Sequence, residues 1–314
     1  MENIISKIKA VVLGHAVADA LGVPVEFMSR SELERSPVTG MMGFGTYPVP
    51  AGAWSDDTSM SVAALDSIAD GKIDWDAIMT AFADWCDRDK YTPTGELFDI
   101  GITCRRAIRR YVCDEIPATE CGLDNENSNG NGSLMRIHPF SLMAWCTHQS
   151  QAEWEPMIDL ASALTHAHGR SKLACRIYTV LLHKLLDAPT KESIGIALQE
   201  ANCLYADHPE LVYYARLFAE DFAKLPCDAI KSTGYVVDSM EAAIWCLLTT
   251  DSYAECVLKA VNLGADTDTV AAIAGGLAGA LYGIEAIPQE WLNTLLCLES
   301  IEEMCERAGK GWRV

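Results

Sequence analysis

The apolar positions of this chain recur at the spacing of an α-helix over almost its whole length. In residues 4–21, for example, Ile5, Ile8 and Val12 share one helical face. Strand-like alternation of apolar and polar residues is nearly absent. Further helices are expected at 58–69, 74–87, 99–112, 140–147, 154–166, 170–187, 190–205, 209–223, 238–249, 252–262, 269–282 and 288–297. Because neither an internal repeat nor a low-complexity linker interrupts this pattern, it predicts one all-α domain over residues 1–314.

Two long segments lack the helical pattern. Residues 31–53 contain repeated proline and glycine, and residues 121–133 are rich in asparagine, glycine and serine. We expect both segments to be irregular. Loops of this length inside a compact domain are usually functional or disordered. The first of them leads directly to an acidic stretch, Trp54–Thr58.

The helix expected at 269–282 is unusually poor in large side chains. Gly275, Gly279 and Gly283 follow one another at four-residue spacing, so one face is nearly bare backbone. A glycine inside a helix costs about 1 kcal/mol relative to alanine, so three of them need a packing reason. We therefore expect another stretch of backbone to pack closely against this face.

Asp56 and Asp57 stand beside the hydroxyl of Ser55 where a helix is expected to begin. Alone, this arrangement is typical of a helix cap, because serine and aspartate are preferred caps and acidic residues favour the first turn. The same hard oxygen atoms also suit Mg²⁺ or Mn²⁺ better than zinc. One cluster by itself favours the cap interpretation.

A second cluster of the same kind changes this interpretation. Asp266, Asp268 and Thr269 open another helix about 210 residues later. The four carboxylates of the two clusters, with the hydroxyls of Ser55 and Thr269, match the charge and ligand preference of two divalent cations. Such a site can leave open positions for a substrate oxygen and an activated water molecule. The two clusters together therefore predict a binuclear metal site.

The composition excludes several classes of partner. The 314 residues include 44 acidic and 24 basic side chains, which gives a formal net charge of −20. This charge disfavours the binding of nucleic acid and of anionic membranes. An anionic small molecule would need metal ions or helix amino termini. We interpret the four arginines of the helix expected at 99–112 as a solvated or salt-bridged face: Arg105, Arg106, Arg109 and Arg110.

The cysteines point to a reducing compartment. Twelve are spread singly along the chain, and no C-x-x-C sequence occurs, which argues against a zinc knuckle and against a redox dithiol. We see no signal peptide, and the apolar runs are judged shorter than a membrane span. We therefore expect a cytoplasmic protein with no membrane partner.

Six motifs, in order along the chain, resemble those of the ADP-ribosylglycohydrolase family. This family includes the dinitrogenase reductase-activating glycohydrolases and the hydrolases of ADP-ribosyl-arginine and ADP-ribosyl-serine. The resemblance extends from about Ile8 to Ile284 and implies a compact, orthogonal all-α domain. The motifs are Gly14–Gly22 followed by Glu26, Trp54–Thr58, Asn129–Arg136, Leu164–His166, Thr233–Val236 and Gly264–Thr269.

The resemblance also implies metal ligands and catalytic residues. Two Mg²⁺ or Mn²⁺ ions would bind Ser55, Asp56, Asp57, Asp266, Asp268 and Thr269. Some family members have Thr in place of Ser55, and either hydroxyl can bind a metal. Glu26 would lie near the scissile bond and act as general acid or base, with Asp57 and Asp268 as the other catalytic residues. The residue type alone would favour a solvent-exposed carboxylate at position 26.

The expected substrate-binding residues follow from the same resemblance. They are Asn129, Gly130, Asn131, Gly132, Ser133, Met135, His166, Gly234 and Tyr235. Glycines in the first of these stretches would let backbone N–H groups approach a pyrophosphate. The residues alone leave other interpretations open: a flexible surface loop, a structural histidine and a core tyrosine. Arg136 could pair with a phosphate, support a carboxylate or have a purely structural role.

These features predict an enzyme that hydrolyses the glycosidic bond between ADP-ribose and an acceptor, with protein ADP-ribosyl-arginine as the expected substrate. Serine-linked and small-molecule conjugates of ADP-ribose remain open as alternatives. A non-catalytic, ADP-ribose-binding or crystallin-like relative is disfavoured because every metal-type residue is present. An all-α phosphohydrolase is disfavoured because its histidine–aspartate metal motif is missing. The sequence does not specify an oligomeric state.

Overall fold

The computed structural model describes residues 2–313, and their regular structure is helical. Strand-type pairing is confined, within these residues, to two isolated bridges, so the predicted all-α fold class is confirmed. The α-helices are α1 (Glu2–Gly22), α2 (Arg30–Arg35), α3 (Asp56–Ile68), α4 (Trp75–Arg88), α5 (Ile102–Asp114), α6 (His138–Cys146), α7 (Gln151–Ala163), α8 (Gly169–Asp187), α9 (Lys191–Leu204), α10 (Val236–Leu248), α11 (Tyr253–Val261), α12 (Thr267–Tyr282), α13 (Gln289–Thr294) and α14 (Leu298–Gly311). Short 3₁₀ helices are η1 (Val23–Val25), η2 (Ala118–Glu120), η3 (Glu126–Ser128), η4 (Pro209–Phe218), η5 (Phe222–Lys224), η6 (Cys227–Ala229) and η7 (Ile284–Ala286).

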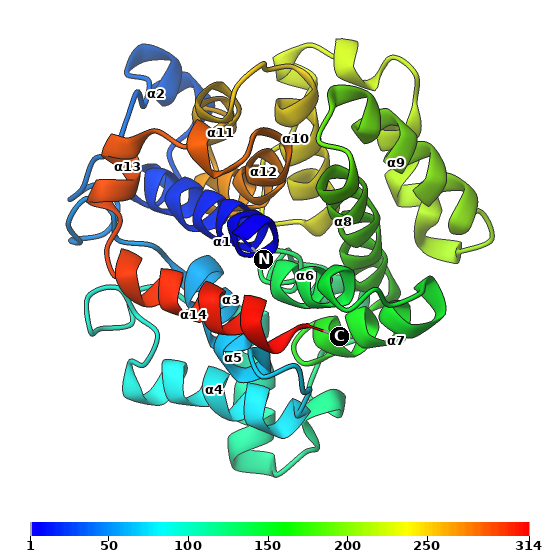
Figure 1. Cartoon of the computed structure of the whole chain (residues 1–314). Coiled ribbons are helices and arrows are strands. Elements are labelled where there is room, and N and C mark those ends of the chain that lie inside the picture. Colours follow the sequence, from blue (N-terminus) through cyan, green and yellow to red (C-terminus); the bar gives the residue numbers. More distant parts are fainter. Residues whose placement is uncertain (1, 314) are drawn as a thin grey trace.

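Helices α1 and α12 pack against each other at the centre of the molecule (Figure 1). A β-carbon on Gly14 would lie 2.6 Å from the carbonyl oxygen of Gly275, and one on Gly279 would overlap the carbonyl of Ala10. The expected close approach of a second backbone is therefore confirmed for Gly275 and Gly279. Gly283 has a different role, because it ends α12 with a φ of +82° and has open space around it.

Helix α1 is the central helix of the fold. The segment Asn3–Val25, which covers nearly all of α1 and the residues just after it, has a mean hydropathy of 1.5. Among the described residues, it is the one helical segment that is both long enough and apolar enough to cross a membrane. The expectation that every apolar run is shorter than a membrane span was therefore wrong. In this structure 94% of its most apolar 18-residue window is buried inside the protein, as expected for a core helix. One hydrophobic core includes side chains from Ile8 to Trp312.

Three elements differ from the sequence-based expectation. The segment expected to be an α-helix at 209–223 forms the 3₁₀ helices η4 and η5, with its tyrosines fixed against α8: Tyr214 donates a hydrogen bond to the carbonyl of Arg170. Helix α2 occurs where an irregular segment was expected, and a capping box between Ser29 and Glu32 starts it. Helix α14 was missed, and it packs against α1 through ion pairs from Lys9.

The α1–α12 contact leads to a prediction about stability. Gly279→Ala should lower the free energy of unfolding by about 1–3 kcal/mol, because the added methyl group overpacks a backbone contact. The matched control is Gly195→Ala in α9, where a β-carbon would meet no atom within 4 Å. That change should raise the free energy of unfolding by up to about 1 kcal/mol. Urea denaturation measures both, and equal effects would contradict the packing account.

Candidate active site

The carboxyl-terminal end of α1 meets the first turn of α12, and this contact places the site. A β-carbon on Gly22 would lie 2.5 Å from the backbone nitrogen of Asp268. Thr267 donates a hydrogen bond of 2.8 Å to the carbonyl of Gly22. Because neither backbone can withdraw without breaking these contacts, acidic residues on the two helices are held close together.

Asp19, on α1, is the residue at the site that the sequence interpretation missed. Its fully buried carboxylate accepts hydrogen bonds from the backbone and hydroxyl groups of Ser55 and from those of Thr58, at 2.6–3.1 Å. It therefore caps α3 from a neighbouring helix. The signal in the sequence was present, since Asp19 is an acidic residue within an otherwise apolar stretch of the first motif.

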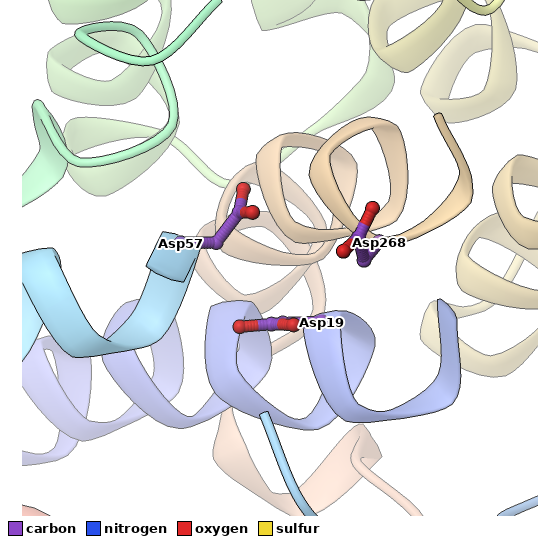
Figure 2. A group of neighbouring side chains, drawn as sticks. All are labelled: Asp19, Asp57 and Asp268. Carbon is purple, nitrogen blue, oxygen red and sulfur yellow. The ribbon is translucent and has the colours of Figure 1, made fainter. Parts of the chain in front are cut away.

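Two groups of carboxylates converge where α1, α3 and α12 meet. Asp19, Asp57 and Asp268 point toward one another, and one oxygen of each lies within 4.8 Å of the others (Figure 2). Glu26, Asp266 and Asp268 form a second group by the same criterion. Asp268 belongs to both groups. Two adjacent sets of oxygen atoms that share one carboxylate are an arrangement that can hold a pair of hard divalent cations.

The surroundings of the Asp57 carboxylate show whether these residues fit a cation. Its Oδ2 lies 3.0 Å from the hydroxyl of Ser55 and 3.1 Å from the hydroxyl of Thr269. Its Oδ1 is buried and has no hydrogen-bond partner among the described residues. A buried, unpartnered carboxylate oxygen is costly unless a cation or proton binds it. The donor set therefore fits a divalent metal.

Asp56 has a separate position at the edge of these groups. Its Oδ2 accepts a hydrogen bond of 3.0 Å from the backbone N–H of Gly101 at the start of α5. Burial, followed by the charge of Asp99, raises the pKa of Asp56 well above its usual range. Asp99 was also missed as a site residue, because it was expected to lie in the helix at 99–112, whereas α5 begins only at Ile102. The prediction that Asp56 and Ser55 bind metal stays a prediction.

Glu26 is buried in the loop after α1, with its carboxylate held in place. Tyr47 donates a hydrogen bond of 2.7 Å to its Oε2, and Thr46 donates one of 2.7 Å to its carbonyl. The expectation of an exposed carboxylate from residue type alone was therefore wrong. Burial, with the nearby charge of Asp99, raises the pKa of Glu26 to about 8.

The loop of Glu26 is paired with the loop of Asp266. The backbone N–H of Phe27 donates to the carbonyl of Ala265 at 2.7 Å, and that of Ala265 donates to the carbonyl of Met28 at 2.7 Å. Phe27 and Ala265 have φ angles of +65° and +62°. Non-glycine residues rarely adopt this conformation, and it is concentrated at functional sites. The paired loops hold Glu26 next to the second carboxylate group.

A cavity of about 440 Å³ opens beside the carboxylates. Its lining includes acidic residues and a threonine: Glu26, Asp56, Asp99, Asp266 and Thr269. It also includes six of the nine expected substrate-binding residues: Gly130, Asn131, Gly132, Met135, His166 and Gly234. The structure thus brings three of the six predicted metal ligands, Asp56, Asp266 and Thr269, to the same cavity as most of the predicted substrate-binding residues.

The loop at 129–133 divides into lining and supporting residues. A β-carbon on Gly132 would lie 2.8 Å from the Sγ of Cys104, so only glycine fits against this wall. The side chain of Asn131 donates to Asp266 at 2.7 Å. Asn129 and Ser133 are turned away from the cavity, bonded to neighbours that include Ser171 for Asn129 and Ser162 for Ser133.

His166 is buried with a defined partner on one side of its ring. Its Nδ1 lies 2.9 Å from the hydroxyl of Thr165, which also accepts a hydrogen bond from Arg136. Burial, with the nearby positive charge of Arg136, lowers the pKa of His166 to about 3. The ring is therefore neutral at neutral pH. Arg136 is fully buried, donates to the carbonyl of Ala161 and lies over the ring of Phe82, so its structural role is the one observed.

Tyr235 lies next to the cavity and does not line it. Its half-buried hydroxyl is 3.1 Å from Arg170, which also pairs with Glu126 and Glu210. Tyr235 is therefore not simply a buried core residue, because its hydroxyl also accepts a hydrogen bond from Arg170. Neighbouring Gly234 lines the cavity, and its carbonyl accepts the N–H of Asn131 at 3.0 Å.

Comparison with known proteins decides the family. A sequence profile of the ADP-ribosylglycohydrolase family matches residues 1–313. The chain belongs to the ADP-ribosylglycohydrolase family. Its ADP-ribosylglycohydrolase fold is also similar to a solved "ADP-ribosylglycohydrolase-related protein complex", with a TM-score of 0.83 and 28% identity over 99% of this chain and 100% of that one.

Two relatives in this family have named activities. The chain is 31% identical to the ADP-ribosylarginine hydrolase Tri1 of Pseudomonas putida, over 97% of this chain and 78% of that one. It is 35% identical to the ADP-ribosyl-[dinitrogen reductase] glycohydrolase of Rhodospirillum rubrum, over 90% of this chain and 88% of that one. The predicted family and the prediction of an ADP-ribosyl hydrolase are therefore confirmed.

The buried carboxylates lead to a prediction about pH. Burial raises the pKa of Asp19 to about 6 and contributes most to the rise for Glu26, to about 8. A carboxylate whose pKa is raised on folding stabilises the protein at low pH, and this stability is lost as pH rises through the folded-state pKa. In chelator, the melting temperature should fall between about pH 5 and pH 8.

The control for this prediction is the same titration in Mg²⁺. Bound cations would favour the ionised carboxylates, so the fall with pH should become shallower. Thermal unfolding followed by circular dichroism measures both curves. Identical pH dependence with Mg²⁺ and with chelator would contradict the assignment of these carboxylates to a cation site.

Proposed function

We propose that the protein hydrolyses the glycosidic bond between ADP-ribose and a protein arginine, and that it depends on two Mg²⁺ or Mn²⁺ ions. The observation that carries the proposal is that Glu26 and Asp266, of the second carboxylate group, line one cavity together with the loop at 130–132, and that Asp268 links this group to the first. The names of the two bacterial relatives, which specify ADP-ribosyl-arginine and ADP-ribosyl-dinitrogen reductase, support this class of substrate.

The proposed metal ligands come from α3 and α12. Asp57 and Asp266 would each serve one ion, and Asp268 would serve both, because it belongs to both carboxylate groups. Ser55, Asp56 and Thr269 complete the proposed set. When bound, the ions would orient the ribose hydroxyls and could lower the pKa of a water molecule next to them. Asp19 would hold the start of α3 next to the first carboxylate group, through its hydrogen bonds with Ser55 and Thr58.

Glu26 is the proposed general acid and base. Glu26 lines the cavity, and in its protonated form it can donate a proton to the departing guanidine nitrogen. The resulting carboxylate can then accept a proton from the attacking water molecule. Tyr47 keeps the carboxylate at the cavity through its hydrogen bond to Oε2. The aspartates are less suited to this role because they are the proposed metal ligands.

The part of the cavity lined by the loop at 130–132, Met135 and His166 is proposed to hold the ADP-ribose. The small residues of the loop at 130–132 let its backbone approach a pyrophosphate, and Met135 supplies an apolar surface. His166, neutral and fixed through its Nδ1, can exchange a hydrogen bond with the ligand through its Nε2. We also propose a cytoplasmic site of action, which is supported by the twelve unpaired cysteines.

The test uses peptides carrying ADP-ribosyl-arginine or ADP-ribosyl-serine, incubated with Mg²⁺, Mn²⁺ or chelator, with free ADP-ribose as the readout. We expect release from the arginine peptide with either metal and none in chelator. Glu26→Gln should lower kcat by about 10²–10⁴-fold, the range for loss of a general acid or base. The exposed carboxylate of Glu285 supplies the control, and Glu285→Gln should leave kcat unchanged.

Three results would contradict parts of the proposal. Release that survives chelation would exclude the metal dependence. Full activity of the Glu26→Gln variant would contradict the proposed role of Glu26 as general acid and base. Release of ADP-ribose from the serine peptide alone would show that serine, and not arginine, is the leaving group.

A further inference from the structure

The exposed face of α5 carries three arginines that form no ion pair with the carboxylates of the described residues. Arg105, Arg106 and Arg109 are exposed, while Ala107 and Ile108 of the same helix are buried against the core. We refer to the three arginines as the α5 arginine surface. It lies on a helix that packs against α4 (Figure 1), and the first turn of this helix lines the cavity.

The ion pairs within residues 3–313 use other arginines. Those that pair with carboxylates are Arg88, Arg170, Arg176, Arg216 and Arg307. Arg110, on the same helix, is half-buried and donates a hydrogen bond of 3.2 Å to the carbonyl of Gly122. No described carboxylate oxygen lies within 4.0 Å of a guanidinium nitrogen of the α5 arginine surface. Of the solvated and salt-bridged alternatives, the solvated one is therefore observed.

This arrangement does not stabilise the helix. Arg105 and Arg109 are four residues apart and Arg106 and Arg109 are three apart, so their like charges are neighbours on the helix. Arg105 and Arg106 also lie near the amino-terminal end, where the helix dipole disfavours positive charge. The chain has 44 acidic side chains, yet none of the described ones forms an ion pair with these arginines. Binding of an external anionic group would account for their positions.

The α5 arginine surface continues from the opening of the cavity. Ile102, Thr103 and Cys104, which begin α5, line the cavity, and the Ile102 side chain is 72% exposed. Phe27 also lines it and is 71% exposed. At 1.5 Å per residue, Arg109 lies about 10 Å along the helix axis from Ile102. A protein whose modified residue enters the cavity would therefore pass over apolar side chains and then meet the arginines.

We propose that the α5 arginine surface binds acidic side chains that flank the ADP-ribosylated residue of a protein substrate. This proposal rests on the proposed hydrolysis of protein-linked ADP-ribose. With a net charge of −20, the protein would otherwise repel an acidic partner. A local positive surface beside the cavity lowers this repulsion where the substrate would enter, so that it also orients the partner.

The test compares two triple variants that remove the same charge. The test variant carries Arg105→Gln, Arg106→Gln and Arg109→Gln. The control variant removes three exposed basic side chains, two on α14 and one just after it, that do not line the cavity, through Arg307→Gln, Lys310→Gln and Arg313→Gln. The substrates are free ADP-ribosyl-arginine, an ADP-ribosyl-arginine peptide flanked by glutamates, and the same peptide flanked by glutamines.

We expect the test variant to raise KM for the glutamate peptide about tenfold, with kcat unchanged. Hydrolysis of the other two substrates should not change, nor should any activity of the control variant. Added salt should remove the difference between wild type and test variant, because exposed charges are screened. An equal effect on all three substrates, no effect on the glutamate peptide, or the same effect in the control variant would each overturn the proposal.

A binding measurement separates this proposal from the proposed function. Fluorescence anisotropy of the labelled ADP-ribosylated glutamate peptide, recorded in chelator, needs no turnover. Weaker binding to the test variant than to wild type and control would support the α5 arginine surface even if no substrate is hydrolysed. Equal binding to all three proteins would contradict it, whatever the activity.

Discussion

The fold depends on keeping several carboxylates together in its interior. Asp19, Asp57 and Asp268 come from three helices, and their oxygen atoms converge within 4.8 Å. The ion pairs within residues 3–313 do not include them, so no lysine or arginine offsets their charge. The amino termini of α3 and α12 contribute partial positive charge. Burial nevertheless raises the pKa of Asp57 and Asp268 well above the usual range, and this is the strain that bound cations would relieve.

Backbone contacts, more than side-chain contacts, set the precision of this arrangement. Helix α12 lies against α1 through Gly275 and Gly279, and the end of α1 meets the start of α12 at Gly22. A flexible side chain between the helices would allow a range of distances, whereas two backbones in contact allow very little. The paired loops of Glu26 and Asp266 extend the same principle to the general acid and base. The carboxylates are therefore held in position before any ligand binds.

The sequence predicted those parts of the site that recur as local patterns. Asp56 and Asp57 were recognisable because they stand together at a helix start, and the loop containing Gly130 and Gly132 was recognisable from its composition. Helix periodicity gave most of the fold in the same way. Position 283 was misjudged because a glycine that ends a helix looks, in sequence, like one that packs inside it.

Residues whose role comes from tertiary contacts could not be predicted in this way. Asp19 caps a helix 36 residues further along the chain, and Tyr47 reaches Glu26 from an irregular segment. Asp99 was assigned to a helix that begins only at Ile102, and it lines the cavity instead. Ser133 and Asn129 were predicted to bind substrate because they belong to the loop, yet their side chains turn into the protein. Family resemblance identifies a stretch of chain, and the fold then decides which side chains face the ligand.

The most direct test of the central claim is the number of Mn²⁺ ions bound per chain. Electron paramagnetic resonance titration counts free Mn²⁺ and also reports magnetic coupling between two ions that share a ligand. The account predicts two coupled ions in the wild type, loss of the coupling in Asp268→Asn, and no change in the exposed control Asp70→Asn. A single ion in the wild type, or two coupled ions in Asp268→Asn, would contradict it.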